Sequence, residues 1–183
     1  RSMVPCRRTG TPVRVKNSYN LDFPGSIIVE KHASEVDAVR AITAVKHVTL
    51  IDIVSTRMMG ASGFLAHIFN QFLKWNISID VIATSEVSVS VTVNTKNCLD
   101  GLLQDIQRVA ATDCKTGKAI VTVICDTARS SSIIADGFSA LAKQNINVQM
   151  ISKGASKVNI SMICDDSEAD TVVKTLHQAY FEN

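Results

Sequence analysis

The chain has 183 residues, of which 46% are hydrophobic, and this composition supports one or two domains with real cores and excludes an intrinsically disordered protein. Its net charge of only +2 argues against a dedicated nucleic-acid-binding protein. No apolar run approaches the roughly 18 residues that a membrane-spanning helix needs, so we expect neither a nucleic acid nor a membrane as a partner.

Residues 1–35 differ from the rest of the chain. All three prolines lie here, and five basic residues precede the first acidic one, Asp22. The pattern predicts a short strand at 12–16, a turn at 23–26 and a second short strand at 27–30. The basic start could be a binding arm, but we favour a severed piece of a neighbouring domain. Without an initial methionine or a signal peptide, the chain is expected to be a fragment of a longer protein.

The remainder of the sequence repeats itself with a period of about 70 residues. The segment 76–82, Asn-Ile-Ser-Ile-Asp-Val-Ile, returns at 145–151 as Asn-Ile-Asn-Val-Gln-Met-Ile, 69 positions later. The stretches 69–74 and 138–143 match at the same offset. Such a period is too long for a solenoid repeat and long enough for a small domain. The sequence therefore predicts two copies of one module.

In the first copy the apolar periodicity changes in a fixed order. A β-rich run at 48–54 is followed by helical spacing at 62–75, strand-like alternation at 77–83 and 87–93, and helical spacing again at 99–109. The order β-α-β-β-α lacks only a last strand of the split βαβ, ferredoxin-like plan. Such a module packs two helices on one face of a four-stranded antiparallel sheet.

The second copy shows the same order and ends without a last strand. Its five elements are predicted at 119–125, 130–144, 146–152, 157–164 and 167–181. A spare β-like stretch at 39–45 precedes the first copy, and we expect it to supply the missing strand. The predicted fold is α+β, with two ferredoxin-like βαββαβ modules, the first inserted within the second. The first module would cover 48–118, and the second 36–47 plus 119–183.

Catalytic motifs are missing from this sequence. The four histidines are scattered, no glycine-rich phosphate loop precedes a lysine, and no nucleophile elbow occurs. No pair of carboxylates has a spacing typical of acid–base catalysis. The five cysteines show no C-x-x-C spacing, which favours a reducing compartment over a disulfide framework or a zinc site. We therefore predict no catalytic residue and no metal site.

The first copy instead carries groups suited to a small zwitterion. Gly60 and Gly63 lie between the first strand and the first helix, where they let a ligand approach the backbone, and Ser62 is a candidate N-cap. A helix N-terminus attracts a carboxylate. Asp80 and Glu86 could hold ammonium groups.

The second copy has lost this constellation. Gln149 stands in place of Asp80, Lys153-Gly154-Ala155 stand in place of Thr84-Ser85-Glu86, and the loop at 126–131 has no glycine. The alternative interpretation is that the two glycines of the first copy form an ordinary turn and that its two acids are only solvated. Spacing alone leaves both interpretations open.

The same residues resemble a known family. Three segments of the first copy closely resemble the first ACT domain of aspartate kinases, best of the lysine-sensitive class: 55–60, 63–66 and 77–89. The segment 148–156 resembles the second ACT domain. The stretches 12–18 and 24–25 are similar to the family's junction at the end of its kinase domain. The resemblance thus implies a C-terminal remnant of a kinase domain and a linker at 1–35.

In this family the first ACT domains of two subunits meet and bind lysine between them, which inhibits the enzyme. The resemblance implies a homodimer with L-lysine as its allosteric effector. The implied ligand residues are Met58, Gly63, Phe64, Leu65, Ser78, Ile79, Asp80, Thr84, Ser85 and Glu86. Ala61 stands where some members have serine, which bears on ligand preference.

The family's catalytic half, with its Lys-Phe-Gly-Gly motif, has no counterpart in this sequence. The resemblance implies an inactive regulatory fragment without a cofactor, whose parent enzyme phosphorylates L-aspartate with ATP and Mg²⁺ and supplies the kinase domain as a partner. The implied location is the cytoplasm, or a plastid in a plant. The alternative is a stand-alone ACT-type small-molecule sensor or dimerisation module. The family-like junction at 12–17 favours the regulatory fragment.

Overall fold

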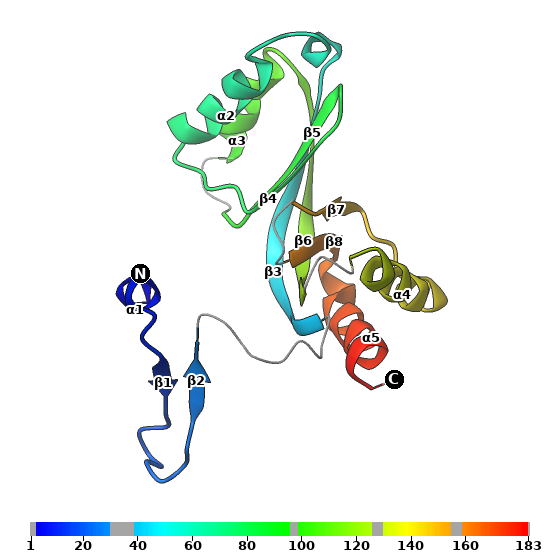
Figure 1. Ribbon diagram of the computed structural model, residues 1–183. Coiled ribbons are helices and arrows are strands. Elements are labelled where there is room, and N and C mark those ends of the chain that lie inside the picture. Colours follow the sequence, from blue (N-terminus) through cyan, green and yellow to red (C-terminus); the bar gives the residue numbers. More distant parts are fainter. Residues whose placement is uncertain (1–2, 30–38, 96–98, 126–129, 155–158, 183) are drawn as a thin grey trace. The chain divides into compact units, whose positions relative to one another are not determined.

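The computed structural model describes residues 3–29, 39–95, 99–125, 130–154 and 159–182. The chain divides into two compact units, one within residues 1–37 and the other within 38–183 (Figure 1). Among the described residues, no helix is both long and apolar enough to cross a membrane.

The N-terminal unit consists of helix α1 (Val4–Thr9) and an antiparallel hairpin of β1 (Val13–Val15) and β2 (Ser26–Ile28). The two strands confirm the predicted β-like stretches, whereas α1 was not predicted. Gly10 ends this helix in the left-handed conformation, with φ 66°. Gly25 closes the hairpin with φ 70°, and a Cβ there would lie 2.2 Å from the carbonyl oxygen of Val15. No described residue of this unit is buried, so these residues form no core of their own.

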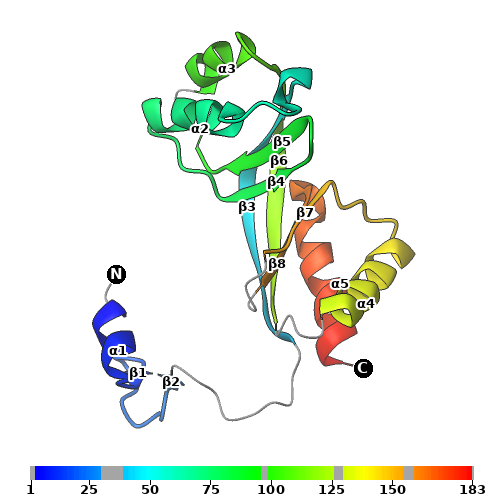
Figure 2. The same cartoon turned by 45° about the horizontal axis from the view of Figure 1, so that its top comes forward.

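The second unit is built on one six-stranded antiparallel sheet with the strand order β4-β5-β3-β6-β8-β7. Its strands are β3 (Val39–Val54), β4 (Val81–Thr84), β5 (Ser88–Val93), β6 (Ala111–Cys125), β7 (Met150–Ser152) and β8 (Asn159–Asp165). Its helices are α2 (Phe64–Lys74), α3 (Leu99–Gln107), α4 (Ser130–Lys143) and α5 (Ala169–Phe181), with short 3-10 turns at Thr56–Met58 and Asp166–Glu168. Figure 2 shows α2 and α3 on one half of the sheet and α4 and α5 on the other.

Two long strands, β3 and β6, run through both modules. Residues 39–45 of β3 pair with the C-terminal half of β6, and residues 50–54 pair with its N-terminal half. The register shifts around His47, whose φ is 62°, where β3 passes from one half-sheet to the other. Residues 39–45 were predicted to supply the missing strand of the second module, and their pairing with β6 confirms it. The fold class of two βαββαβ modules is confirmed as well. The module boundaries at 48–118 and at 36–47 plus 119–183 stay predictions, because both modules lie within one compact unit.

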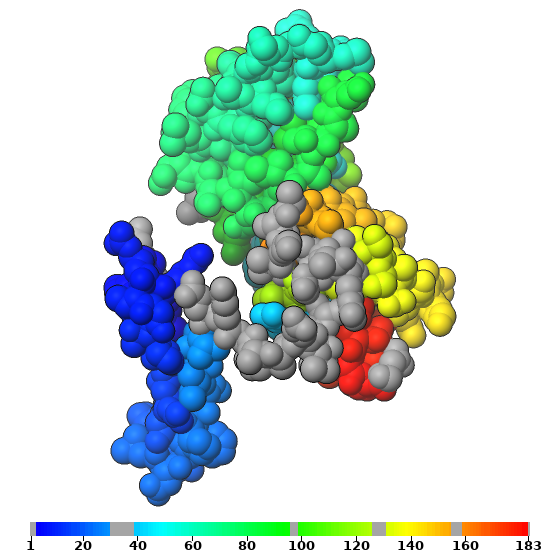
Figure 3. Space-filling view, in the orientation of Figure 1, coloured from blue at the N-terminus to red at the C-terminus, as the bar shows by residue number. Residues whose placement is uncertain are grey.

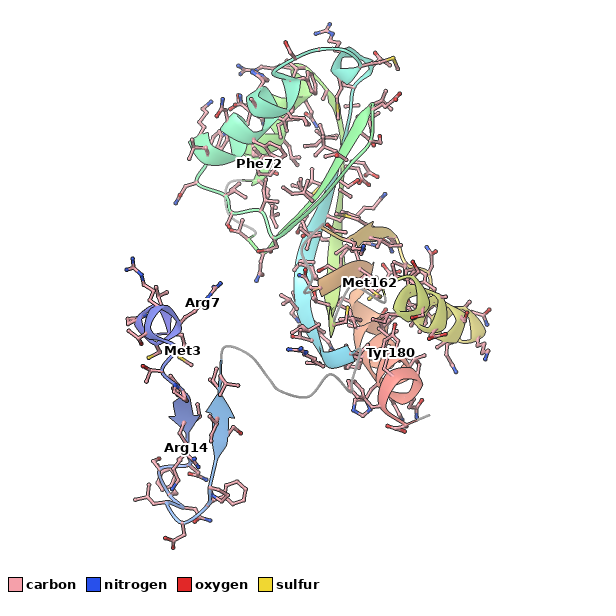
Figure 4. The ribbon with its side chains drawn as sticks, in the orientation of Figure 1. Met3, Arg7, Arg14, Phe72, Met162 and Tyr180 are labelled. Carbon is pink, nitrogen blue, oxygen red and sulfur yellow. The ribbon has the colours of Figure 1, made fainter. Side chains whose placement is uncertain are left out.

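Three hydrophobic cores follow from the period-2 alternation of these strands. Ile51 and Ile53 of β3 face α2 and α3, in the core that also holds Phe72. The core under α4 and α5 holds Met162 (Figure 4). The third core lies on the other face of the sheet, where the modules meet, and its buried members are Val48, Leu50, Ile120, Met150 and Ile163. This third core joins the two modules into one unit.

The strongest repeat in the sequence marks the same helix end in both modules. Asn76 and Asn145 follow α2 and α4 in the left-handed conformation, with φ 52° and 56°. The N–H groups of Ile77 and Ile146 donate back to carbonyl groups of the preceding helix at 2.9 and 3.1 Å, as in a Schellman motif. The residues after these asparagines lead the chain from helix to sheet, so β4 and β7 are shorter than the strands predicted from 77 and 146.

An aromatic ring lies against a glycine between the two helices of each module. A Cβ on Gly101 of α3 would lie 2.3 Å from the ring of Trp75, and one on Gly137 of α4 would lie 2.1 Å from the hydroxyl of Tyr180. The Trp75 ring is held in place, because its Nε1 donates to Asp105 at 2.9 Å. The absence of a side chain at Gly101 is therefore a packing requirement.

We predict that Gly101→Ala lowers the free energy of unfolding by about 1–3 kcal/mol, because the methyl group overpacks the Trp75 contact. An alanine at an open helix position would instead stabilise the helix by about 0.5–1 kcal/mol. Urea denaturation measures the difference. Gln104→Ala, at an exposed position of the same helix, is the control and should be neutral or stabilising. A Gly101→Ala variant more stable than wild type would contradict the packing analysis.

Candidate functional site

The loop between β3 and α2 is fastened by Ser55, which is only 8% exposed. Its hydroxyl donates to the carbonyl of Val109 at 3.2 Å and accepts from the N–H of Arg57 at 3.3 Å. Its own N–H donates to the carbonyl of Val87 at 2.9 Å. The side chain of Ser55 thus ties the loop to the chain after α3, and its backbone N–H ties the loop to the residue directly before β5. This role of Ser55 was not predicted from the sequence, although a serine directly before a helical turn is a usual capping signal.

Helix α2 begins without a side-chain cap. Its N-cap residue is Gly63, with φ 84°, a conformation that glycine adopts without strain. The predicted cap, Ser62, is wrong, because the helix begins one residue later and no side chain bonds to its first turn. The first-turn N–H groups therefore have no side-chain acceptor, and the positive end of the helix dipole adds to their attraction for an anion.

Ser85 shapes the turn between β4 and β5. Its Oγ lies 2.7 Å from the Oγ of Ser88 and accepts from the N–H of Ser88 at 3.1 Å. The N–H of Ser85 also donates to the carbonyl of Ser88 at 2.8 Å. These bonds fix the turn that carries the exposed side chain of Glu86.

A surface pocket of about 510 Å³ joins this turn to the loop before α2. Its lining residues are Met58, Met59, Gly60, Ala61, Phe64, Leu65, Ser85 and Glu86. Five of them belong to the ten predicted ligand residues: Met58, Phe64, Leu65, Ser85 and Glu86. The other three lining residues, Met59, Gly60 and Ala61, were not among the ten. The walls are largely apolar, with one acidic group at the turn.

The predicted ligand residues 78–80 lie apart from this pocket, on the stretch that leads into β4. The N–H of Asp80 donates to the carbonyl of Thr92 at 2.9 Å, and the hydroxyl of Thr92 accepts from the N–H of Val81 at 3.0 Å. Buried Thr92 therefore sets the position of Asp80. Thr92 was not predicted from the sequence, because in an alternating strand a threonine with a buried hydroxyl has the same pattern as one that faces solvent. Ile79 packs against the first core, whereas Ser78 is exposed.

Asp80 and the pocket lie at opposite ends of β4. Five residue steps separate Asp80 from Ser85, which corresponds to about 16 Å in an extended strand. Gly63 and Thr84 adjoin the pocket in sequence without lining it. One chain therefore brings together only part of the predicted set.

The two acids of the predicted ligand set are Asp80 and Glu86. Among the described residues, no ion pair involves Asp80 or Glu86. Partial desolvation raises the pKa of Asp80 above its usual value. A cation bound at Asp80 would oppose this shift, since an opposite charge favours the ionised carboxylate.

The second module uses the corresponding position differently. Gln149 Nε2 donates to Oδ1 of Asp165 at 3.0 Å, and Lys118 Nζ donates to the same oxygen at 2.5 Å. These bonds, first that from Lys118 and then that from Gln149, lower the pKa of Asp165. The side chains of Gln149, Lys118 and Asp165 thus serve as hydrogen-bond partners for one another. Residues 126–129 of the glycine-free loop and Ala155 lie outside the described residues.

Metal binding finds no support in the described part of the chain, where no three His, Cys, Asp or Glu side chains cluster as metal ligands would.

Known proteins are similar to this chain over nearly its whole length. The ACT domain family matches residues 51–103 and 126–180. Chloroplastic aspartokinase 3 of Arabidopsis thaliana is 45% identical over 99% of this chain and 34% of its own length. Lysine-sensitive aspartokinase 3 of Escherichia coli K12 is 29% identical over 99% of this chain and 42% of its own length. The crystal structure of E. coli aspartokinase III with lysine and aspartate matches 98% of this chain and 41% of its own, with 30% identity and a TM-score of 0.84. The chain thus spans between a third and a half of the length of these relatives.

We predict that Asp80→Asn leaves stability unchanged or raises it at pH 7. The raised pKa of Asp80 means that the folded state disfavours its charge, so the charged carboxylate reduces stability above this pKa. The gain should vanish as the pH falls below the unfolded pKa, where both states are protonated. Asp105→Asn is the matched contrast: bonds from Lys74 and Trp75 lower the pKa of Asp105, so its loss should destabilise. Urea unfolding at pH 7 and at low pH measures both, and a clear loss of stability in Asp80→Asn at pH 7 would contradict the assignment.

Proposed function

This chain belongs to the ACT domain family, and its tandem ACT domains match the regulatory region of aspartokinases; from this premise we propose that it senses an end product for an aspartate kinase and that L-lysine is the effector. The observation that carries the proposal is the asymmetry between the modules. Among the described residues, Asp80 and Glu86 of the first module take part in no ion pair and α2 has no side-chain cap, whereas Gln149 in the second module is bonded to Asp165.

Lysine fits the groups of the first module. The uncapped first turn of α2 suits its carboxylate, and Asp80 and Glu86 suit its two ammonium groups. The apolar walls at Met58, Phe64 and Leu65 suit its methylene chain. The name of the E. coli relative describes it as lysine-sensitive, and the matched E. coli structure contains lysine, which supports the same effector here.

A second copy of the chain completes the proposed site. Asp80 and the pocket are separated along β4 by more than the length of one lysine, so a single chain cannot place both on one ligand. Two chains lying antiparallel along their β4 strands would bring the partner's Asp80 to the pocket. β4 is an edge strand of the sheet, and Ile82 at its centre is 40% exposed, whereas its neighbours Val81 and Ala83 pack against the third core. An exposed, apolar edge strand is a usual site of pairing between chains.

The N-terminal unit supports a catalytic partner within the same protein. Its described residues are all partly or fully exposed, and a groove of about 570 Å³ among them is lined by Met3, Val4, Ile28 and Val29, among others. We therefore assign 1–35 to the end of a kinase domain and a linker, with aspartate phosphorylation, ATP and Mg²⁺ belonging to the catalytic half. A stand-alone sensor would have to keep this apolar surface in water. The chloroplastic plant relatives support a plastid location.

We predict that L-lysine binds this chain and that Asp80→Ala weakens binding about tenfold or more, since a hydrogen bond to a charged group contributes roughly 1.5–3 kcal/mol. A bulky Thr84→Met or Ser85→Leu should obstruct the groove. Isothermal titration calorimetry measures each dissociation constant. Gln149→Ala is the control in the second module and should change it little. If Gln149→Ala abolished binding while Asp80→Ala left it intact, the site would belong to the other module.

We predict a homodimer in the presence of lysine, and Ile82→Asp should convert it to a monomer and abolish lysine binding, because it places a charge in the apolar contact along β4. Analytical ultracentrifugation measures the mass. Ile151→Asp, at the corresponding position of β7 with 43% exposure, is the control and should remain dimeric. A wild-type monomer at micromolar concentration with lysine present would refute the two-chain site.

A further inference from the structure

Strand β7 of the second module lies against strand β4 of the first, which carries the proposed ligand residues at its two ends (Figures 1 and 2). The hydroxyl of Ser152 donates to the carbonyl of Ile82 at 2.8 Å. Ser152 is the last residue of β7, and Ile82 lies in the middle of β4. This hydrogen bond joins two positions that are 70 residues apart in the sequence.

The inner face of β4 also rests on the second module. Val81 and Ala83 pack against the third core, in which Met150 is 7% exposed and Ile163 is fully buried. Figure 3 shows the green surface of the first module continuing into the orange residues around β7. The second module therefore packs against the inner face of β4 and donates a hydrogen bond to its backbone.

This support matters because β4 has little else to hold it. Within one chain it is an edge strand of four residues, and among the described residues it pairs only with β5. Asp80 directly precedes it, and Ser85 directly follows it. Any displacement of β4 would move both ends of the proposed ligand site together.

We propose that the second module is a structural part of the first module's ligand site, with Ser152 as a positioning residue for β4. This inference rests on the proposed function. The copies differ at this point: in the repeat, Ala83 of the first module corresponds to Ser152, so only the second module offers a hydroxyl. A module that has lost its own ligand groups thus keeps a role at the effector site of its neighbour.

The hydrogen bond from Ser152 affects the fraction of molecules in which β4 occupies the position that binds the ligand. An apparent dissociation constant rises in proportion as the competent fraction falls. A neutral hydrogen bond shifts such an equilibrium by roughly two- to tenfold. Ser152 therefore acts on affinity without touching the ligand.

The experiment compares Ser152→Ala with Ser161→Ala in the full 183-residue chain. Ser161 lies opposite Ser152 on β8, and its hydroxyl is 3.0 Å from that of Thr122, so its loss removes a side-chain hydrogen bond that stays within the second module. The measurements are the L-lysine dissociation constant by calorimetry and amide hydrogen exchange of residues 81–84 without lysine. We expect Ser152→Ala to raise the dissociation constant roughly two- to tenfold and to speed exchange in β4. Ser161→Ala should do neither, and Ser152→Thr, which keeps a hydroxyl, should restore both.

The outcomes separate the inference from the proposed function. If the wild type binds lysine and Ser152→Ala changes neither affinity nor exchange in β4, the positioning role is overturned and the effector assignment stands. An equal loss of affinity in Ser161→Ala would also overturn it, because the effect would then be a general loss of stability. If the wild type does not bind lysine but Ser152→Ala speeds exchange in β4, the effector assignment is overturned and the mechanical support of β4 is retained.

Discussion

The continuous pairing of β3 with β6 is the constraint on which the rest of the second unit depends. Each strand is long enough to serve both modules, so neither half-sheet is complete without a segment that belongs mainly to the other. The pairing of β3 with β6 brings together the faces of the two half-sheets that lie away from the helices. The third core forms between these faces. Because backbone pairing and apolar burial are shared in this way, the two modules are expected to unfold as one cooperative unit.

This shared framework explains how two copies of one fold can differ in chemistry. Both modules end their first helix on a left-handed asparagine, and both pack an aromatic ring on a helical glycine. Such features stabilise the module and leave the turns free to vary. Four residues after the asparagine, the first module has Asp80, which forms no ion pair among the described residues, whereas the second bonds Gln149 to Asp165. In the proposed site, the first module thus carries the ligand groups, and the second module supports the strand β4 that holds them.

Much of this architecture was predictable from local patterns. The repeat, the helical and strand periodicities and the spare stretch at 39–45 led to the inserted two-module fold, because apolar periodicity reports which side of an element is buried. Prediction failed where local signals are weak. Helix α1 is too short for a clear period, and its described residues are not buried. Ser62 is a good capping residue by type, but the backbone at Gly63 places the start of α2 one residue later.

Residue type and order were enough to predict the fold class, the two copies and which copy carries Asp80, Glu86, Gly60 and Gly63. How these groups are distributed in space depends on the folded chain. The tertiary structure placed Glu86 in a pocket with Met58 and Phe64, and it left Asp80 at the far end of β4. It also brought Ser152 to the carbonyl of Ile82. These relations depend on which strands pair and in which register, and such long-range contacts leave no local pattern in the chain.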